Sequence, residues 1–204
     1  MPNFRKKMLI PPAYQFYKWA SSDVSDSPAL NPKVVTDLYW GRDFDHVEIP
    51  FKLTRDNVPA INGYFGSVRV GNGAGINLYQ PVLGEFRTVS GWQYKTFSTI
   101  PEVDKLYVYK ADFATQKVFL NDEEVSVNTS ADSSSLFTLF AVKNNNAEYC
   151  IIGETKLSLS GVLVADLVPA RHFGETGFYD KIRDVWYPAS SYYSPTYPLY
   201  LFND

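Results

Sequence analysis

The sequence predicts an all-β fold, in which two antiparallel sheets pack as a sandwich within one domain. Short runs rich in Val, Ile, Tyr and Phe recur at intervals of about 8 to 15 residues, and turn-forming residues separate them. The apolar periodicity of an amphipathic helix is almost absent. A chain of 204 residues also falls in the size range in which all-β sandwiches form a single domain.

The expected strands follow from these apolar runs in chain order. The run 44–53 is the clearest, because apolar side chains from Val47 to Leu53 alternate with polar ones, as in a half-solvated strand. The glycines of 71–75 predict a turn between two further strands. The full set of expected strands is 13–19, 34–40, 44–53, 62–70, 76–82, 92–99, 105–113, 117–120, 135–143, 147–153 and 156–170.

A stretch near the C-terminus predicts a strand end, an exposed connection and a hairpin. Pro169 has no backbone N–H, and we expect the strand to end there. Gly174 and Gly177 are expected to allow turns in the exposed connection that follows. Residues 178–188 are then expected to form a small hairpin whose turn lies in water.

Three segments divide the chain. We expect an N-terminal arm at 1–12, the sandwich domain at 13–190 and an aromatic, proline-rich C-terminal tail at 191–204. Its prolines exclude a regular helix or a central strand, so the tail should run extended over a surface. That surface belongs either to its own domain or to a neighbouring subunit. The candidate partner-interface residues are Tyr192, Tyr193 and Tyr197.

Charge and residue usage exclude several classes of partner. A net charge of −3 gives no basic field for phosphate groups, so nucleic acid is not an expected partner. No apolar run approaches the ~20 residues of a membrane span, and the first residues lack the apolar stretch of a secretory signal. We therefore expect no membrane insertion. The single cysteine, Cys150, lies in an apolar stretch and is expected to be a buried small hydrophobe in a protein that folds in a reducing compartment.

Catalytic, metal and cofactor sites are not expected. His46 and His172 have no Cys or His partner at metal-ligand spacing, and we expect His172 in a surface loop. Glu102 and Asp104 stand two residues apart, as on one face of a strand in some glycoside hydrolases, but Tyr107 replaces the second catalytic carboxylate. The simpler interpretation is a pair of acidic residues at a turn that enters a strand. We expect no enzyme activity.

Two aromatic residues are candidates for carbohydrate binding. Trp92 and Tyr94 lie on the same face of one expected strand, 92–99. Such a pair can stack on a sugar ring or fill the core, and burial in the core is the more frequent outcome for large aromatic side chains.

The second half of the chain carries a series of motifs. A strand ending in Leu-Phe-Ala (139–141) precedes an Asn-rich turn, and a later strand reads Asp-Leu-Val-Pro-Ala (166–170). A glycine-containing segment with Phe-Tyr-Asp-Lys and a final Trp-Tyr pair follows. This series, within 135–190, resembles the concanavalin A-like lectin/glucanase (LamG-like) domains of bacteriophage tail, fibre and head proteins. The residues that match are Gly174, Gly177, Phe178, Tyr179, Asp180, Lys181, Trp186 and Tyr187.

The resemblance extends more weakly to 13–70, and it has two departures. Many members have Cys where this chain has Ala170, and the tail from Ser190 to Asp204 replaces a short final strand. The resemblance implies a jelly-roll sandwich of the concanavalin A-like type. Because that architecture hosts lectins, hydrolases and structural modules, function must be argued from sites.

The function expected from the resemblance is that of a non-enzymatic virion structural protein in the head, tail or fibre. Such a protein folds in the host cytoplasm, is displayed on the particle, aids host adhesion, and has other virion proteins and further copies of itself as partners. The alternative is a carbohydrate-binding or receptor-binding module that recognises host surface glycans. A glycan hydrolase is the third and least favoured reading.

Overall fold

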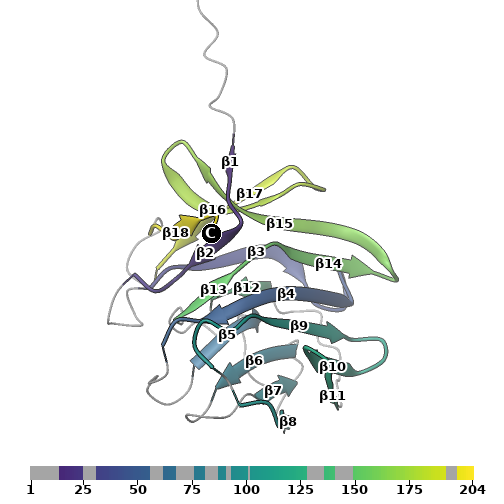
Figure 1. Cartoon of the computed structure of the whole chain (residues 1–204). Helices are drawn as coiled ribbons and strands as arrows, with labels where there is room; N and C mark the ends of the chain where they lie inside the picture. The colour runs from purple at the N-terminus through teal and green to yellow at the C-terminus, as the bar shows by residue number, and fades with distance from the viewer. Residues whose placement is uncertain are drawn as a thin grey trace, which may run out of the picture.

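The computed structural model describes residues 14–24, 31–55, 62–67, 76–80, 87–90, 93–100, 102–127, 136–140, 149–191 and 197–204. Within these ranges every regular element is a β-strand (Figure 1). The strands pair antiparallel, and the parallel contacts in the described chain are two isolated bridges. The all-β prediction is therefore confirmed. The same residues contain no apolar helix of the length that a bilayer crossing requires.

The larger sheet, sheet A, centres on β4, which pairs with β9 on one side and with β13 and β14 on the other (Figure 1). From β14 the sheet continues through β15 and β16 to β17, and β1 lies against the end of β15. From β13 it continues to β2 and β18. Its strands are β1 (Gln15–Phe16), β2 (Trp19–Ser21), β4 (His46–Leu53), β9 (Tyr107–Asp112), β10 (Lys117–Leu120), β11 (Glu123–Ser126), β13 (Cys150–Ile152), β14 (Thr155–Leu159), β15 (Val162–His172), β16 (Glu175–Asp180), β17 (Val185–Ser190) and β18 (Tyr200–Phe202).

The second sheet, sheet B, runs in the order β8, β7, β6, β5, β12, β3. Its strands are β3 (Lys33–Tyr39), β5 (Asn62–Ser67), β6 (Ile76–Gln80), β7 (Arg87–Ser90), β8 (Gln93–Thr96) and β12 (Leu136–Leu139). Strand β17 joins the two sheets, because Pro188 pairs with β16 while Ala189 pairs with Val34 of β3. One side of the structure is therefore closed by a shared strand.

Aromatic side chains of the two sheets meet in the core. The ring of Phe51 in β4 lies 5.3 Å from that of Phe65 in β5, and Phe65 lies 5.0 Å from Tyr109 in β9. Near one end Phe44 packs edge-on against Phe137 of β12 at 5.4 Å. All five side chains are fully buried. This packing of sheet A on sheet B is what a β-sandwich requires.

Two of the three local predictions for β4, β15 and the β16–β17 hairpin are confirmed. The alternation in β4 is confirmed, since every second residue from Val47 to Leu53 is buried. The hairpin of 178–188 is also confirmed, as β16 and β17. Pro169 does not end its strand, because β15 continues to His172. The carbonyl of Pro169 accepts a hydrogen bond from the backbone N–H of Tyr17, which lies just beyond the end of β1. The pairing of β15 with β1 stops at this point, so β15 tolerates the missing N–H of Pro169 there.

The two glycines of this region have different roles, and the turn role predicted for Gly177 is wrong. Gly174 does occupy a turn, with φ 86° after Phe173 at φ 49°, as expected for a two-residue hairpin connection. Gly177 lies inside β16 and is buried. A Cβ atom there would lie 2.1 Å from the backbone oxygen of Tyr187. Gly177 therefore permits the close approach of β17 rather than a turn.

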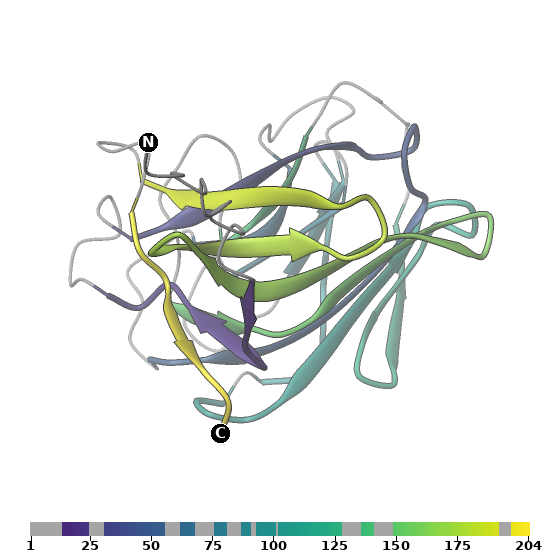
Figure 2. The ribbon, with the colours of Figure 1, turned by 90° about the horizontal axis from the view of Figure 1, so that it is seen from above.

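The described part of the tail packs on its own domain. Strand β18 pairs with β2, with Leu201 opposite Ala20, and Figure 2 shows the two strands side by side. Leu199 is 3% exposed and belongs to the core. Of the two expected surfaces for the tail, residues 197–204 therefore use that of their own domain. Tyr192 and Tyr193 lie outside the described residues.

Candidate functional site

Aromatic side chains gather on the outer face of sheet A, where β1, β15, β16 and β17 meet. We call this group the aromatic surface. Its members are Tyr14, Phe16, His172, Phe173, Tyr179 and Trp186.

Strand register places these side chains on one face. Tyr179 of β16 pairs directly with Trp186 of β17, and cross-strand partners point to the same side of a sheet. Phe178, the next residue in β16, points to the opposite side and is fully buried in the core. Phe16 of β1 pairs with Ala170 of β15 and so lies on the same face. The face is therefore the outer one.

Tyr14 lies at the centre of the aromatic surface. Its ring centroid is 4.1 Å from that of His172 and 4.2 Å from that of Tyr179, with interplanar angles of 26° and 31°. Trp186 lies 5.7 Å from Tyr14. His172 thus ends a strand and stacks on a tyrosine, which corrects its expected position in a loop.

Much of the aromatic surface is open to solvent. Phe16 is 46% exposed and Phe173 is 64% exposed, and the other members are partly exposed. Scattered exposed apolar residues are normal, whereas a contiguous exposed apolar patch marks an interaction site. The arrangement favours an interface over a purely structural role.

A carboxylate borders the aromatic surface. The hydroxyl of Tyr179 donates to Oδ1 of Asp184 at 2.5 Å, and Asp184 lies in the β16–β17 turn at φ 57°. This hydrogen bond, with burial and the charge of Asp184, raises the pKa of Tyr179 to about 12. Burial and the charge of Asp184 also raise the pKa of Tyr14. Both tyrosines therefore stay neutral at physiological pH, with a negative charge beside them.

Other residues of the β16–β17 hairpin have structural roles. Asp180 is fully buried, and its Oδ1 accepts hydrogen bonds from the backbone N–H groups of Ile182 at 3.0 Å and Asp166 at 3.1 Å. Lys181 lies 3.4 Å from Glu154 and joins the turn to the segment before β14. The hairpin is held rigidly from its inner side while its outer side carries Tyr179 and Trp186.

An ion pair fixes the same hairpin to sheet B. Arg183 donates to both carboxylate oxygens of Asp37 in β3, at 2.8 and 2.9 Å, and the hydroxyl of Tyr187 also donates to Asp37. The hydrogen bonds from Arg183, and secondly from Tyr187, lower the pKa of Asp37 to about 2 against the opposing effect of burial. Asp37 therefore remains a carboxylate throughout the physiological range.

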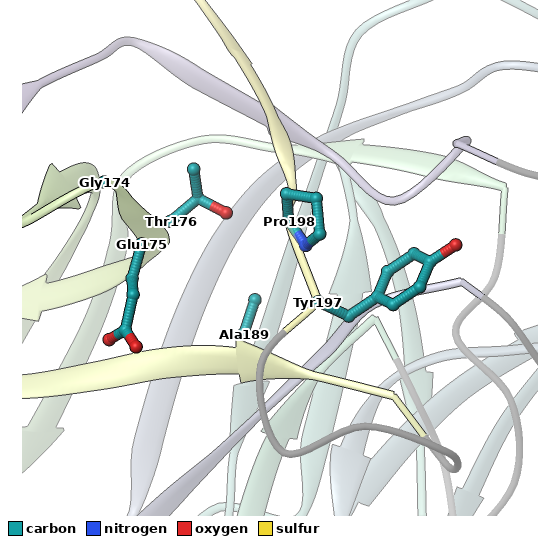
Figure 3. A pocket seen from close by; sticks show the side chains of 6 residues that line it. All are labelled: Gly174, Glu175, Thr176, Ala189, Tyr197 and Pro198. Carbon is teal, nitrogen blue, oxygen red and sulfur yellow. The ribbon is translucent and has the colours of Figure 1, made fainter.

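A small pocket lies beyond the β15–β16 turn (Figure 3). Its volume is about 230 Å³, below the range of typical ligand sites. The tail forms one wall, since the N–H of Tyr197 donates to the carbonyl of Ala189 at 3.1 Å and that of Leu199 donates to Oγ1 of Thr176 at 2.6 Å. Figure 3 shows the ring of Tyr197 directed away from Glu175. Tyr197, expected at a partner interface, is thus tied by its backbone to its own domain.

Of the two expected carbohydrate-binding residues, the structure describes Tyr94. Tyr94 lies in β8 and is 56% exposed, so the core interpretation is wrong for this residue. The guanidinium of Arg87 lies 4.6 Å above its ring. Trp92 lies outside the described residues.

The acidic pair before β9 lies at a turn rather than on one face of a strand. Asp104 has φ 58°, and the exposed carboxylate of Glu102 pairs with Lys105 at 2.5 Å. The simpler interpretation of this pair is confirmed. Cys150 is fully buried, as predicted. Among the described residues no group of three His, Cys, Asp or Glu side chains is arranged to hold a metal ion.

Sequence reasoning missed the aromatic surface. Tyr14 and Phe16 alternate in the sequence, and Tyr179 and Trp186 are placed to pair across a hairpin whose turn is 181–184. Those patterns could have indicated two short aromatic rows. Only the pairing of β1 with β15 brings the rows together. In comparisons with known proteins, no protein-family model matches the chain, and no curated protein matches its sequence.

Proposed function

We propose that this chain is a non-enzymatic structural protein of a bacteriophage virion, built on a jelly-roll sandwich of the concanavalin A-like type. It folds in the host cytoplasm and attaches to another virion protein through the aromatic surface. The observation that carries the proposal is the contiguous, partly exposed aromatic surface on the outer face of sheet A. Tyr, Trp and Phe are enriched in protein interfaces, and Tyr and Trp are frequent among the few residues that dominate the binding energy.

The sequence resemblance supports the same proposal. The motif residues Gly177, Asp180 and Lys181 build the β16–β17 hairpin, by close strand approach, turn hydrogen bonds and an ion pair. The motif residues Tyr179 and Trp186 lie on its outer side. A rigid hairpin that presents aromatic side chains holds them ready for a partner, and such preorganisation lowers the entropy cost of binding.

The test is the composition of purified particles of the phage or prophage that encodes the chain. We expect quantitative mass spectrometry to find the chain at a fixed copy number per particle. Trp186→Ala should lower that number strongly, because truncating an interface aromatic removes a hot spot. Tyr94→Ala, at a more exposed aromatic position on the other sheet, is the control and should leave the copy number unchanged. Absence of the wild-type chain from the particles would contradict the proposal.

A second candidate function is recognition of a host surface glycan through Tyr94. The observation that favours it is the exposed ring of Tyr94 on β8, the last strand of sheet B, with Arg87 stacked on one of its faces. A ring face can stack on the C–H side of a sugar while a guanidinium donates to its hydroxyls. A glycan array should then show binding that Tyr94→Ala abolishes and Trp186→Ala preserves. Equal binding by both variants would reject this candidate.

A further inference from the structure

Two tyrosines of this chain, the partly exposed Tyr39 and the buried Tyr149, share one arrangement, in which an arginine stacks on the ring and pairs with an aspartate. The guanidinium of Arg42 lies 3.8 Å from the ring centroid of Tyr39. The same group donates to both oxygens of Asp43, at 2.9 and 2.8 Å. The planar guanidinium can satisfy the ring face and the carboxylate together, which an ammonium does less well.

The second example lies at the end of β4. Arg55 stacks on Tyr149 at 4.4 Å and donates to both oxygens of Asp23, at 3.1 and 2.7 Å. The three residues come from distant parts of the chain, so the arrangement is not a consequence of local sequence. It shows how this protein joins an aspartate to a tyrosine ring through an arginine.

The aromatic surface contains a third tyrosine–aspartate pair without its arginine. Asp184 accepts a hydrogen bond from the hydroxyl of Tyr179, and its charge also acts on Tyr14. In the part of the chain that the structure describes, no Arg or Lys pairs with Asp184 or stacks on these two rings. Glu175 adds a second carboxylate, since it pairs across the turn with His172 and shares its face. A carboxylate thus lies at each end of β16, and the one of Asp184 contacts the hydroxyl of Tyr179.

We propose that the aromatic surface binds an arginine side chain of another virion protein, which stacks on its rings and pairs with the carboxylate of Asp184. The inference rests on the proposed function and names the chemistry of the partner. Charge complementarity supports it, because the carboxylate of Asp184 beside the aromatic rings attracts a cation and repels a phosphate or an acidic sugar.

The contacts of the arginines that the structure describes favour a different protein over a second copy of this chain as the source of the arginine. Each arginine in the described ranges is already engaged by a carboxylate or a tyrosine ring of its own chain, while Arg5 and Arg69 lie outside those ranges. The engaged arginines are Arg42, Arg55, Arg87, Arg171 and Arg183. If one of these arginine side chains bound a neighbouring copy instead, it would lose a contact within its own chain for each contact that it gained.

The first test is an NMR titration of the full chain with N-acetyl-L-arginine methylamide. We expect saturable shifts of the Trp186 indole signal. The corresponding citrulline derivative, which has the same shape without the charge, should give none. Asp184→Asn should weaken binding about tenfold, since a hydrogen bond to a charged group is lost. Asparagine tolerates the positive φ of this position, so the turn is preserved. Asp122→Asn, in an exposed turn, is the matched control.

Equal binding of the arginine and citrulline derivatives, or no loss in Asp184→Asn, would overturn the inference. The second test separates it from the proposed function by measuring copy number in particles. If the wild-type chain is present and the Asp184→Asn variant is depleted, the result supports both the virion role and the arginine site. Wild-type and Asp184→Asn present at equal copy number overturns the arginine site and leaves the virion role standing. Wild-type chain missing from particles overturns the virion role, and the titration alone then decides the site.

Discussion

Gly177 offers a direct test of how the hairpin below the aromatic surface is packed. An added Cβ would lie 2.1 Å from the backbone oxygen of Tyr187, 3.0 Å from its carbonyl carbon and 2.9 Å from the Cα of Pro188. A normal carbon–oxygen contact is about 3.3 Å, so β17 would have to move by about 1.2 Å. Strand β17 is hydrogen-bonded to β16 and to β3, and it cannot move without disturbing one of them. We expect Gly177→Ala to cost about 3 kcal/mol, the upper part of the range for overpacking.

The matched control is Gly161→Ala in the β14–β15 turn. Gly161 has φ 79°, but a Cβ there would meet no atom within 4 Å. Its cost is conformational alone, about 1–2 kcal/mol. Urea unfolding followed by tryptophan fluorescence gives the free energy of unfolding of both variants. A loss for Gly177→Ala that is equal to or smaller than the loss for Gly161→Ala would refute the packing argument.

Two further predictions concern the elements that hold this end of the fold. Asp37→Asn should lower the free energy of unfolding at pH 7 by less than about 1 kcal/mol, because Asp37 and its ion-pair partner Arg183 are partly exposed. The folded pKa of Asp37 lies near 2, below its ordinary value, so its contribution is complete above about pH 4 and is lost as the pH falls toward 2. Acid titrations of wild type and Asp37→Asn should therefore converge over that interval, and parallel curves would contradict the assignment. Removal of residues 197–204 deletes β18 and the buried Leu199, and thermal unfolding should show a loss of about 3 kcal/mol or more. An unchanged melting temperature would show that the tail is not part of the core.

The sequence predicts the fold class and the strands whose patterns are local. The strand β4 is recognisable because one of its faces is buried and the other is partly exposed to solvent. Apolar and polar residues therefore alternate along its sequence. The hairpin of β16 and β17 is recognisable from a polar turn between aromatic runs. In both cases neighbouring residues carry all the information.

Features that depend on a second segment could not be predicted in this way. The sequence predicts that a strand ends at Pro169. The proline is tolerated inside β15 because the neighbouring strand β1 ends beside it. Gly177 reads as a turn residue, and its true role depends on the distance to β17. Leu199 is buried because the tail packs on its own domain. A proline-rich sequence does not indicate which surface the tail covers.

The aromatic surface shows the same limit at the level of the site. Tyr14 reaches Tyr179 across 165 residues of sequence, and their rings lie 4.2 Å apart only because β1 pairs with β15. The expected sites, Trp92 with Tyr94 and the three tail tyrosines, were selected because they are close in the sequence. Residues that are close in space and far apart in the sequence carry no such signal in a single chain.

The most direct test of the account is photo-crosslinking within assembled particles. A photoreactive phenylalanine at position 173, in the aromatic surface, is compared with one at position 162, since Phe173 is 64% exposed and Val162 is 66% exposed. The account predicts that the probe at 173 crosslinks to one other virion protein and that the probe at 162 does not. Equal crosslinking from the two positions, or none from 173 in particles that contain the chain, would contradict the claim that the aromatic surface is the site of attachment.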